Sequence, residues 1–175
     1  PNYTIALNLL KSMDQFQVKP TAEFFRNIAG KAPDFQTAFR LLETVDMYKT
    51  KPSAEIFRNI AGKALDYPMA LSLLKTMDKY KVKPSPGVFE SIAGKAPNYS
   101  TAQGMLKTMD KYSIKPTADV FKTIVGKAPN FQNALSALEI MDRYSVKPSA
   151  EVFKNIVAKA PDFQTAFRLL ETVDM

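Results

Sequence analysis

Lysine recurs in this sequence at intervals of 32 residues, and the series is the first candidate for chemistry. Its members are Lys31, Lys63, Lys95, Lys127 and Lys159. The chain has 24 basic and 17 acidic residues, so its net charge of +7 leaves such a series uncompensated. Aligned lysines can follow the phosphates of a nucleic-acid backbone. Lysines near the C-terminus of a helix also bond its free carbonyl groups, so a structural role is an equal alternative.

A second lysine series precedes a proline in each repeat, and here we favour the structural role: Lys19, Lys51, Lys83, Lys115 and Lys147. Oppositely charged residues also recur three positions apart. On a helix this spacing predicts exposed ion pairs, which contribute a few tenths of a kcal/mol each. The pairs are Glu23–Arg26, Glu55–Arg58, Asp119–Lys122 and Glu151–Lys154, while the corresponding residues of the third repeat are Gly87 and Glu90.

Catalysis is not expected from these residues. The sequence contains no His and no Cys, and its acids and bases recur in similar surroundings. An active site needs unequal neighbours that separate pKa values. Gly30 and Lys31 lack the glycine spacing and the preceding strand of a phosphate-binding loop. We therefore predict a protein that is not an enzyme, with no cofactor and no metal site.

The spacing of these residues reflects a repeat that fills the whole chain. The segment PDFQTAFRLLETVDM occurs at residues 33–47 and again at 161–175, which is four periods of 32 later. The sequence predicts a single repeat array with no second domain. Its repeats are 1–32, 33–64, 65–96, 97–128 and 129–160, followed by the half repeat 161–175.

Each repeat contains two segments with helical periodicity. In residues 33–64, the first has the apolar stripe Ala38, Leu41, Leu42 and Val45, with its N-cap at Asp34 and counterparts at Asn2, Asp66, Asn98, Asn130 and Asp162. The second has the stripe Phe57, Ile60, Ala61 and Ala64 and ends near Gly62 and Lys63. Its expected N-cap is Ser53, with counterparts at Thr21, Ser85, Thr117 and Ser149.

Short links force such helices into antiparallel hairpins, and a hairpin buries its stripes only by stacking. The expected fold is therefore all-α: a right-handed superhelical α-solenoid of eleven helices. An aromatic residue closes each first helix, and inter-repeat packing is favoured over base stacking for this series: Phe16, Tyr48, Tyr80, Tyr112 and Tyr144.

The apolar residues of the terminal helices include Phe163, Ala166, Leu169, Leu170 and Val173. We expect the chain to be a module of a longer array, with end-to-end self-association through these uncapped helices. No apolar run reaches the length of a membrane span.

The stretch ALSLLKTMDKYKVKPSPGVF at residues 70–89 resembles the pentatricopeptide repeat. The family's Ala-led stripe ending in Met, its later proline and its following aromatic correspond here to Ala70, Leu73, Leu74, Met77, Pro84, Ser85 and Phe89. Equivalent matches occur around Pro20, Pro52, Pro116 and Pro148, so the resemblance covers the chain. The 32-residue repeat is shorter than the family's.

The resemblance implies binding of single-stranded RNA, one base per repeat, with bases read by two residues of each repeat. The first residue follows the aromatic, and in the five repeats it is Arg26, Arg58, Glu90, Lys122 and Lys154. The second follows the proline, and it is Thr21, Ser53, Ser85, Thr117 and Ser149. The family's usual polar type stands one place after the first set, at Asn27, Asn59, Ser91, Thr123 and Asn155. The family also has an aliphatic residue two places before the aromatic, which wedges between bases. This wedge position holds Glu23, Glu55, Gly87, Asp119 and Glu151.

The favoured function is thus a module that binds single-stranded RNA on the concave face of the second helices, with Lys31, Lys63, Lys95, Lys127 and Lys159 on the phosphates. The alternatives are a scaffold for a protein partner and a self-assembling array with no ligand. Phosphate binding would weaken steeply with salt, which separates it from the alternatives. The compartment stays open, and an organelle is compatible with the resemblance.

Overall fold

The computed structural model describes residues 3–167 of the chain. Within that range the chain forms ten α-helices, a further helical segment at residues 163–167, and no strand. We call the first helix of each repeat outer and the second inner. The outer helices are α1 (Tyr3–Gln15), α3 (Phe35–Met47), α5 (Tyr67–Lys79), α7 (Tyr99–Lys111) and α9 (Phe131–Arg143). The inner helices are α2 (Ala22–Lys31), α4 (Ala54–Gly62), α6 (Pro86–Gly94), α8 (Ala118–Gly126) and α10 (Ala150–Val157).

The outer helices begin at the predicted caps. The Asp34 carboxylate accepts a hydrogen bond from the backbone N–H of Thr37 at 2.8 Å, which satisfies a first-turn donor. The same bond occurs at Asp66, Asn98, Asn130 and Asp162. Asn2 lies outside the described residues. Residues 163–167 are helical, so the eleventh helix starts where the sequence predicts it, and its remaining residues are not described.

The inner helices follow the capping prediction in three repeats and depart from it in two. The side chains of Thr21, Ser53 and Ser149 accept cap hydrogen bonds. Ser85 and Thr117 occupy the same position without a side-chain cap bond. At Ser85 the N–H of Val88 donates to the backbone carbonyl alone, and the buried hydroxyl has no partner. Nothing in the structure explains the missing bond at Thr117.

A left-handed turn links each outer helix to the following inner helix. Its central residue has a φ near +50°, and the five instances are Gln17, Lys49, Lys81, Ser113 and Ser145. In the second repeat the Thr50 N–H donates to the Val45 carbonyl and the Lys49 N–H to the Asp46 carbonyl. This pair of bonds is the Schellman motif, which satisfies the last carbonyls of a helix.

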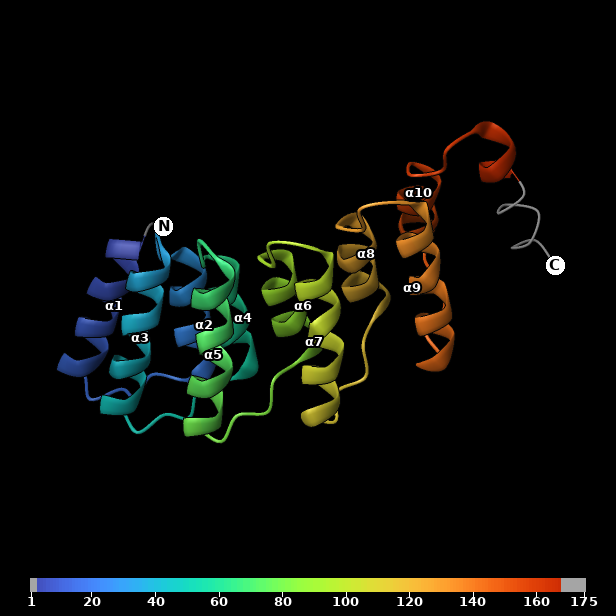
Figure 1. Cartoon of the computed structure of the whole chain (residues 1–175). Coiled ribbons are helices and arrows are strands. Elements are labelled where there is room, and N and C mark those ends of the chain that lie inside the picture. The colour runs from blue at the N-terminus through green and yellow to red at the C-terminus, as the bar shows by residue number, and fades with distance from the viewer. Residues whose placement is uncertain (1–2, 168–175) are drawn as a thin grey trace. The chain divides into compact units, whose positions relative to one another are not determined.

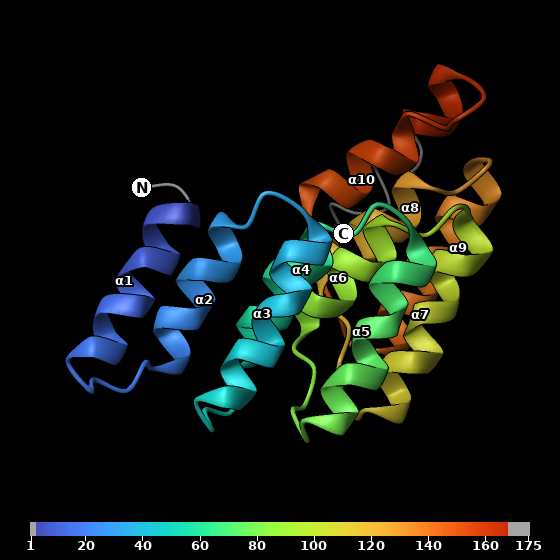
Figure 2. The same ribbon diagram turned by 90° about the vertical axis from the view of Figure 1, so that its left-hand side faces the viewer.

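The helices pack into two compact bodies, Pro1–Lys95 with α1–α6 and Ala96–Met175 with α7–α10. In the N-terminal body α2, α4 and α6 are consecutive neighbours, and α1, α3 and α5 cover them from one side (Figure 1). Figure 2 shows the same hairpins turned by 90°. In the C-terminal body α8 contacts α7, α9 and α10. No helix of residues 3–167 is long and apolar enough to cross a membrane.

The core consists of the predicted stripes. Ala38, Leu41, Leu42 and Val45 are buried on α3, and all four of their counterparts are buried on α5 and α7. A phenylalanine with 0% exposure stands at the centre of four inner helices: Phe25, Phe57, Phe89 and Phe121. Burial of such side chains supplies the main stabilising free energy of the array.

The aromatic residues that close the outer helices pack between repeats, as predicted. The Tyr80 ring lies 6.1 Å from the Phe57 ring of the previous repeat, and its hydroxyl donates to the Asp46 carboxylate at 2.8 Å. Tyr48 and Tyr144 make the same pair of contacts one repeat back. Phe16 is 77% exposed, because the sequence contains no earlier repeat that could supply these partners.

Candidate nucleic-acid interface

The lysine series lies at one end of the inner helices. Lys31 is the last residue of α2, while Lys63, Lys95 and Lys127 are the C-caps of α4, α6 and α8. Lys159 follows the C-cap of α10. Lysine at these positions complements the negative end of the helix dipole. Among residues 3–167 the ion pairs are confined to the first turns of inner helices, so none of the five lysines forms one.

Two lysines show that structural roles contribute as well. The Lys159 ammonium donates to the Gly126 carbonyl of the previous inner helix at 3.5 Å. Lys115, from the pre-proline series, donates to the Ser145 carbonyl at 3.0 Å. Each bond crosses a repeat junction. A structural role is therefore observed in each series.

The predicted ion pairs are all present on the inner helices. Their N–O distances are 3.0 Å for Arg26–Glu23, 3.6 Å for Arg58–Glu55, 3.4 Å for Lys122–Asp119 and 3.8 Å for Lys154–Glu151. All eight side chains are well exposed, so each pair stabilises its helix only slightly. The cations of the first base-facing set are thus largely neutralised within their own repeats.

The third repeat differs because Gly87 leaves room for its neighbour. A Cβ atom at Gly87 would lie 2.8 Å from Nε of Arg58, closer than real contacts allow. The Arg58 side chain therefore lies across α6 at the wedge position of the third repeat. Glu90, the first base-facing candidate of that repeat, is partly exposed.

The polar residues one place later are engaged with the backbone. The Asn59 side-chain amide donates to the Arg26 carbonyl of the previous repeat at 3.1 Å, and Asn155 donates to Lys122 in the same way at 3.4 Å. Ser91 and Thr123 donate to carbonyls one turn earlier in their own helices. The exposed Asn27 accepts a bond from its neighbour Arg26. Sequence reasoning did not anticipate the junction bonds of the two asparagines.

The second base-facing set lies at the N-terminal ends of the inner helices. Its members Thr21, Ser53, Ser85, Thr117 and Ser149 are N-cap residues, and three of them use their oxygen for capping. The two sets and the lysine series therefore lie along the inner helices, the caps at one end and the lysines at the other. Base-reading and phosphate-contact roles for these residues stay predictions.

A polar hollow lies on the inner helices of the N-terminal body. Its volume is about 510 Å³, and its lining is Gly30, Arg58, Asn59, Gly62, Lys63 and Ser91. The lining includes two cations and no carboxylate. A Cβ atom at Gly30 would lie 3.4 Å from the Asn59 amide nitrogen, which is an ordinary contact distance. The hollow can accept an anionic group.

Lys63 also acts on the neighbouring outer helix. The pKa of Asp34 is lowered, chiefly by its hydrogen bonds with Thr37 and further by the charges of Arg40 and Lys63. Among the residues that the structure describes, no cluster of three acidic side chains could hold a metal ion. The chemistry of the inner face is that of exposed ammonium groups and short polar side chains.

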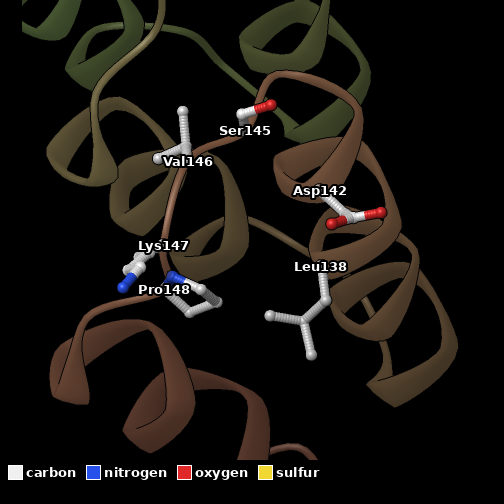
Figure 3. A pocket seen from close by; sticks show the side chains of 6 residues that line it. All are labelled: Leu138, Asp142, Ser145, Val146, Lys147 and Pro148. Carbon is white, nitrogen blue, oxygen red and sulfur yellow. The ribbon is translucent and has the colours of Figure 1, made fainter.

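A second hollow, of about 430 Å³, is lined by Leu138, Asp142, Ser145, Val146, Lys147 and Pro148 (Figure 3). In the first repeat, the counterparts of Asp142 and Pro148 are Asp14 and Pro20, which bond to Tyr48 and Thr50 of the next repeat. This hollow therefore corresponds to a position that residues of the following repeat contact at the first junction.

We compared the sequence and the structure of this chain with those of known proteins. The sequence matches no family profile and no curated protein. Among solved structures the chain is similar to the PPR domain of Arabidopsis thaliana protein-only RNase P 1, solved in complex with tRNA. The TM-score is 0.61 and the identity 18%, over 85% of this chain and 83% of that one.

The pentatricopeptide repeat protein PPR10 from maize aligns over 98% of this chain, with a TM-score of 0.70 and 24% identity. PPR10 in complex with an 18-nt psaJ RNA element aligns with a TM-score of 0.65 and 18% identity. This chain spans only 26% of the PPR10 chain. At these identities the likeness concerns the fold, and in fold this chain is a PPR-like helical repeat protein.

Proposed function

We propose that this chain is a non-enzymatic module that binds single-stranded RNA along its inner helices. The observation that carries the proposal is the lysine series at the ends of these helices, whose members form no ion pair within residues 3–167. The polar hollow beside Lys63 and Arg58 supports it. Likeness to solved PPR structures, two of which contain RNA, supports it as well.

In this proposal the ligand is held mainly through its phosphates. The lysines recur once per repeat, and each can contact one phosphate of an extended strand. The cations at the first base-facing position contribute less, since Glu23, Glu55, Asp119 and Glu151 pair with them. Binding should therefore depend strongly on salt and only weakly on sequence. The third repeat, with Gly87 and Glu90, is the one at which a base preference would appear first.

Fluorescence anisotropy with a randomised single-stranded RNA pool, a DNA pool of equal length and a salt series tests the proposal. Each phosphate contact contributes about −0.7 to the slope of log affinity against log salt for a single strand. The double variant Lys63→Glu, Lys95→Glu should therefore flatten the slope by about 1.4 and weaken binding. Lys11→Glu with Lys75→Glu is the matched control, because it changes the net charge equally but alters the outer helices α1 and α5.

Equal loss in the two double variants would show that only total charge matters and would overturn the assignment to the inner face. Absence of RNA binding at low salt would overturn the nucleic-acid function itself. In that case the inner face would have to be tested as a docking surface for a protein partner.

The expected end-to-end association also stays a proposal. Its basis is the exposure of Ile5, Leu9 and Val18 near the first helix, each above 50%, and of Phe163 at 80%. Sedimentation velocity over a concentration series would detect the association as a rising mean mass.

A further inference from the structure

The outer helices of the C-terminal body contain a cleft that the repeat pattern does not require. It lies between α7 and α9, has a volume of about 680 Å³ and is lined by Ser100, Gln103, Gly104, Leu106, Lys107, Asp110, Ile140, Arg143 and Tyr144. It belongs to the outer layer, away from the lysine series on the inner helices. The proposed RNA-binding function does not use these residues.

The array itself shows which residues open the cleft, because every position has counterparts in other repeats. The counterparts of Gln103 are Leu7, Phe39, Leu71 and Leu135, and those of Gly104 are Asn8, Arg40, Ser72 and Ser136. Ile140 replaces a small hydroxyl residue, as at Thr44, Thr76 and Thr108. A Cβ added at Gly104 would meet no atom within 4 Å, so this glycine is not needed for helix packing. A glycine inside a helix costs about 1 kcal/mol relative to alanine, and packing gives no compensation here.

The lining of the cleft has more basic than acidic side chains, which favours an anionic ligand. Lys107 and Arg143 are exposed, and neither takes part in an ion pair with any residue of the described range 3–167. The one carboxylate in the lining, Asp110, accepts a hydrogen bond from the Tyr144 hydroxyl at 2.8 Å. Burial, and then this bond with Asp110, raises the pKa of Tyr144, so its hydroxyl stays a donor at neutral pH.

The shape and the remaining lining favour a peptide over a nucleic-acid strand. Residues Ser100 to Asp110 extend for about 15 Å along α7, which matches an extended segment of about four or five residues. Leu106 and Ile140 line the cleft beside the cations and can contact an apolar side chain of a peptide, which a phosphate chain lacks. We propose that this cleft binds a short acidic segment of a protein partner, with a carboxylate between Lys107 and Arg143 and an apolar side chain on Leu106 and Ile140.

A fluorescein-labelled pool of short peptides tests the proposal. Each peptide carries two acidic residues flanked by randomised apolar residues, and a control pool carries the corresponding amides. The acidic pool should bind and shift the backbone amide resonance of Gly104, while the amide pool should not. Lys107→Glu should weaken binding by about tenfold or more, since it places a like charge opposite the ligand. This substitution is compatible with the fold, because Glu43 and Glu139 occupy the same register.

The matched control is Lys75→Glu on α5, which has the register of Lys107 and also lowers the net charge from +7 to +5. It should leave peptide affinity within about twofold. Ile140→Thr restores the residue of the other repeats and should weaken binding without a change in net charge.

Three results would overturn the proposal: no binding of the acidic pool at low salt, equal losses in the two lysine variants, or resonance shifts away from Gly104. A shift of Gly104 by RNA but not by peptide would assign the cleft to nucleic acid instead. Loss of RNA binding on the inner helices would leave the peptide result unaffected, so the two proposals fail separately.

Discussion

Asn59 offers the sharpest separation between a structural residue and a base-reading residue. Its side-chain amide donates to the Arg26 carbonyl at 3.1 Å, across the junction between the first and second repeats. Asn27 has the same register in the first repeat, where it is exposed and bonds only to its neighbour Arg26. Asn59→Ala therefore removes an amide that bonds across a repeat junction. Asn27→Ala removes the same group at a position where it bonds within its own repeat.

The expected loss in Asn59→Ala is one neutral hydrogen bond, about 1 kcal/mol of the free energy of unfolding. For a chain of this length that corresponds to a fall in Tm of about 2–4 °C. Asn27→Ala should change the unfolding free energy by less than about 0.5 kcal/mol. Thermal unfolding followed by circular dichroism measures both. RNA affinity, measured by anisotropy, should stay within about twofold for Asn59→Ala, because its amide is already committed to the backbone.

Gly30 provides a second, independent check. A Cβ at Gly30 would lie 3.4 Å from the Asn59 amide nitrogen, an ordinary contact distance, so Gly30→Ala should leave the junction bond in place and raise Tm because alanine favours the helix. In the Asn59→Ala background the same change should raise Tm by a similar amount, since the two side chains would only touch and their effects should add. An unchanged Tm in Asn59→Ala together with a tenfold loss of RNA affinity would refute this reasoning. The amide would then face the ligand, as the resemblance implies.

Three further predictions concern stability. Ser53→Ala should lower the free energy of unfolding by about 1 kcal/mol, because the cap bond is lost. Ser85→Ala should be neutral or stabilising, because its buried hydroxyl has no partner. Urea denaturation of the two variants measures the difference. Lys49→Gly should stabilise the array by about 1 kcal/mol, since Lys49 has a φ of 49°, and an unchanged denaturation midpoint would contradict this. Burial first, and then the bond with Asp46, raises the pKa of Tyr80 from 10.0 to about 12, so this group's contribution is complete below pH 10 and is lost as pH rises through about 12. Tyr80→Phe should reduce the fall in Tm over that pH range, and equal pH profiles for the two proteins would contradict the assignment.

Most of the fold could be predicted because the repeat presents each local signal several times. The stripe Leu41, Leu42 and Val45 and the cap Asp34 each follow from spacing and residue type alone. The left-handed turns could not be predicted, because their central residues, such as Lys49 and Ser113, are not the glycine or asparagine that usually marks this conformation. The backbone adopts it there because the Schellman bonds and the packing of both helices outweigh the local cost.

The candidate interface was less accessible from sequence, because the partner of a polar side chain depends on three-dimensional spacing. Ser53 and Ser85 have the same register and residue type, yet one caps its helix and the other is buried without a bond. Asn59 could be read as base-facing or as a junction residue until its distance to the Arg26 carbonyl was known. Sequence spacing identifies which residues share a face, but it does not show which of them are already bonded.

A repeat array separates structural demands from specific ones, since whatever packing requires must recur. The inner lysines recur in every full repeat, so their recurrence fits both contact with phosphates and helix capping. Only the salt dependence of RNA affinity, with outer-helix lysine variants as the control, can separate these two roles. Gly104 is the opposite case, because its counterparts show that the fold accommodates larger residues at this position. Packing between repeats does not explain such a departure, which therefore points to a contact outside the array. For this chain, departures from the repeat are a better guide to specific partners than the conserved spacing of its charges.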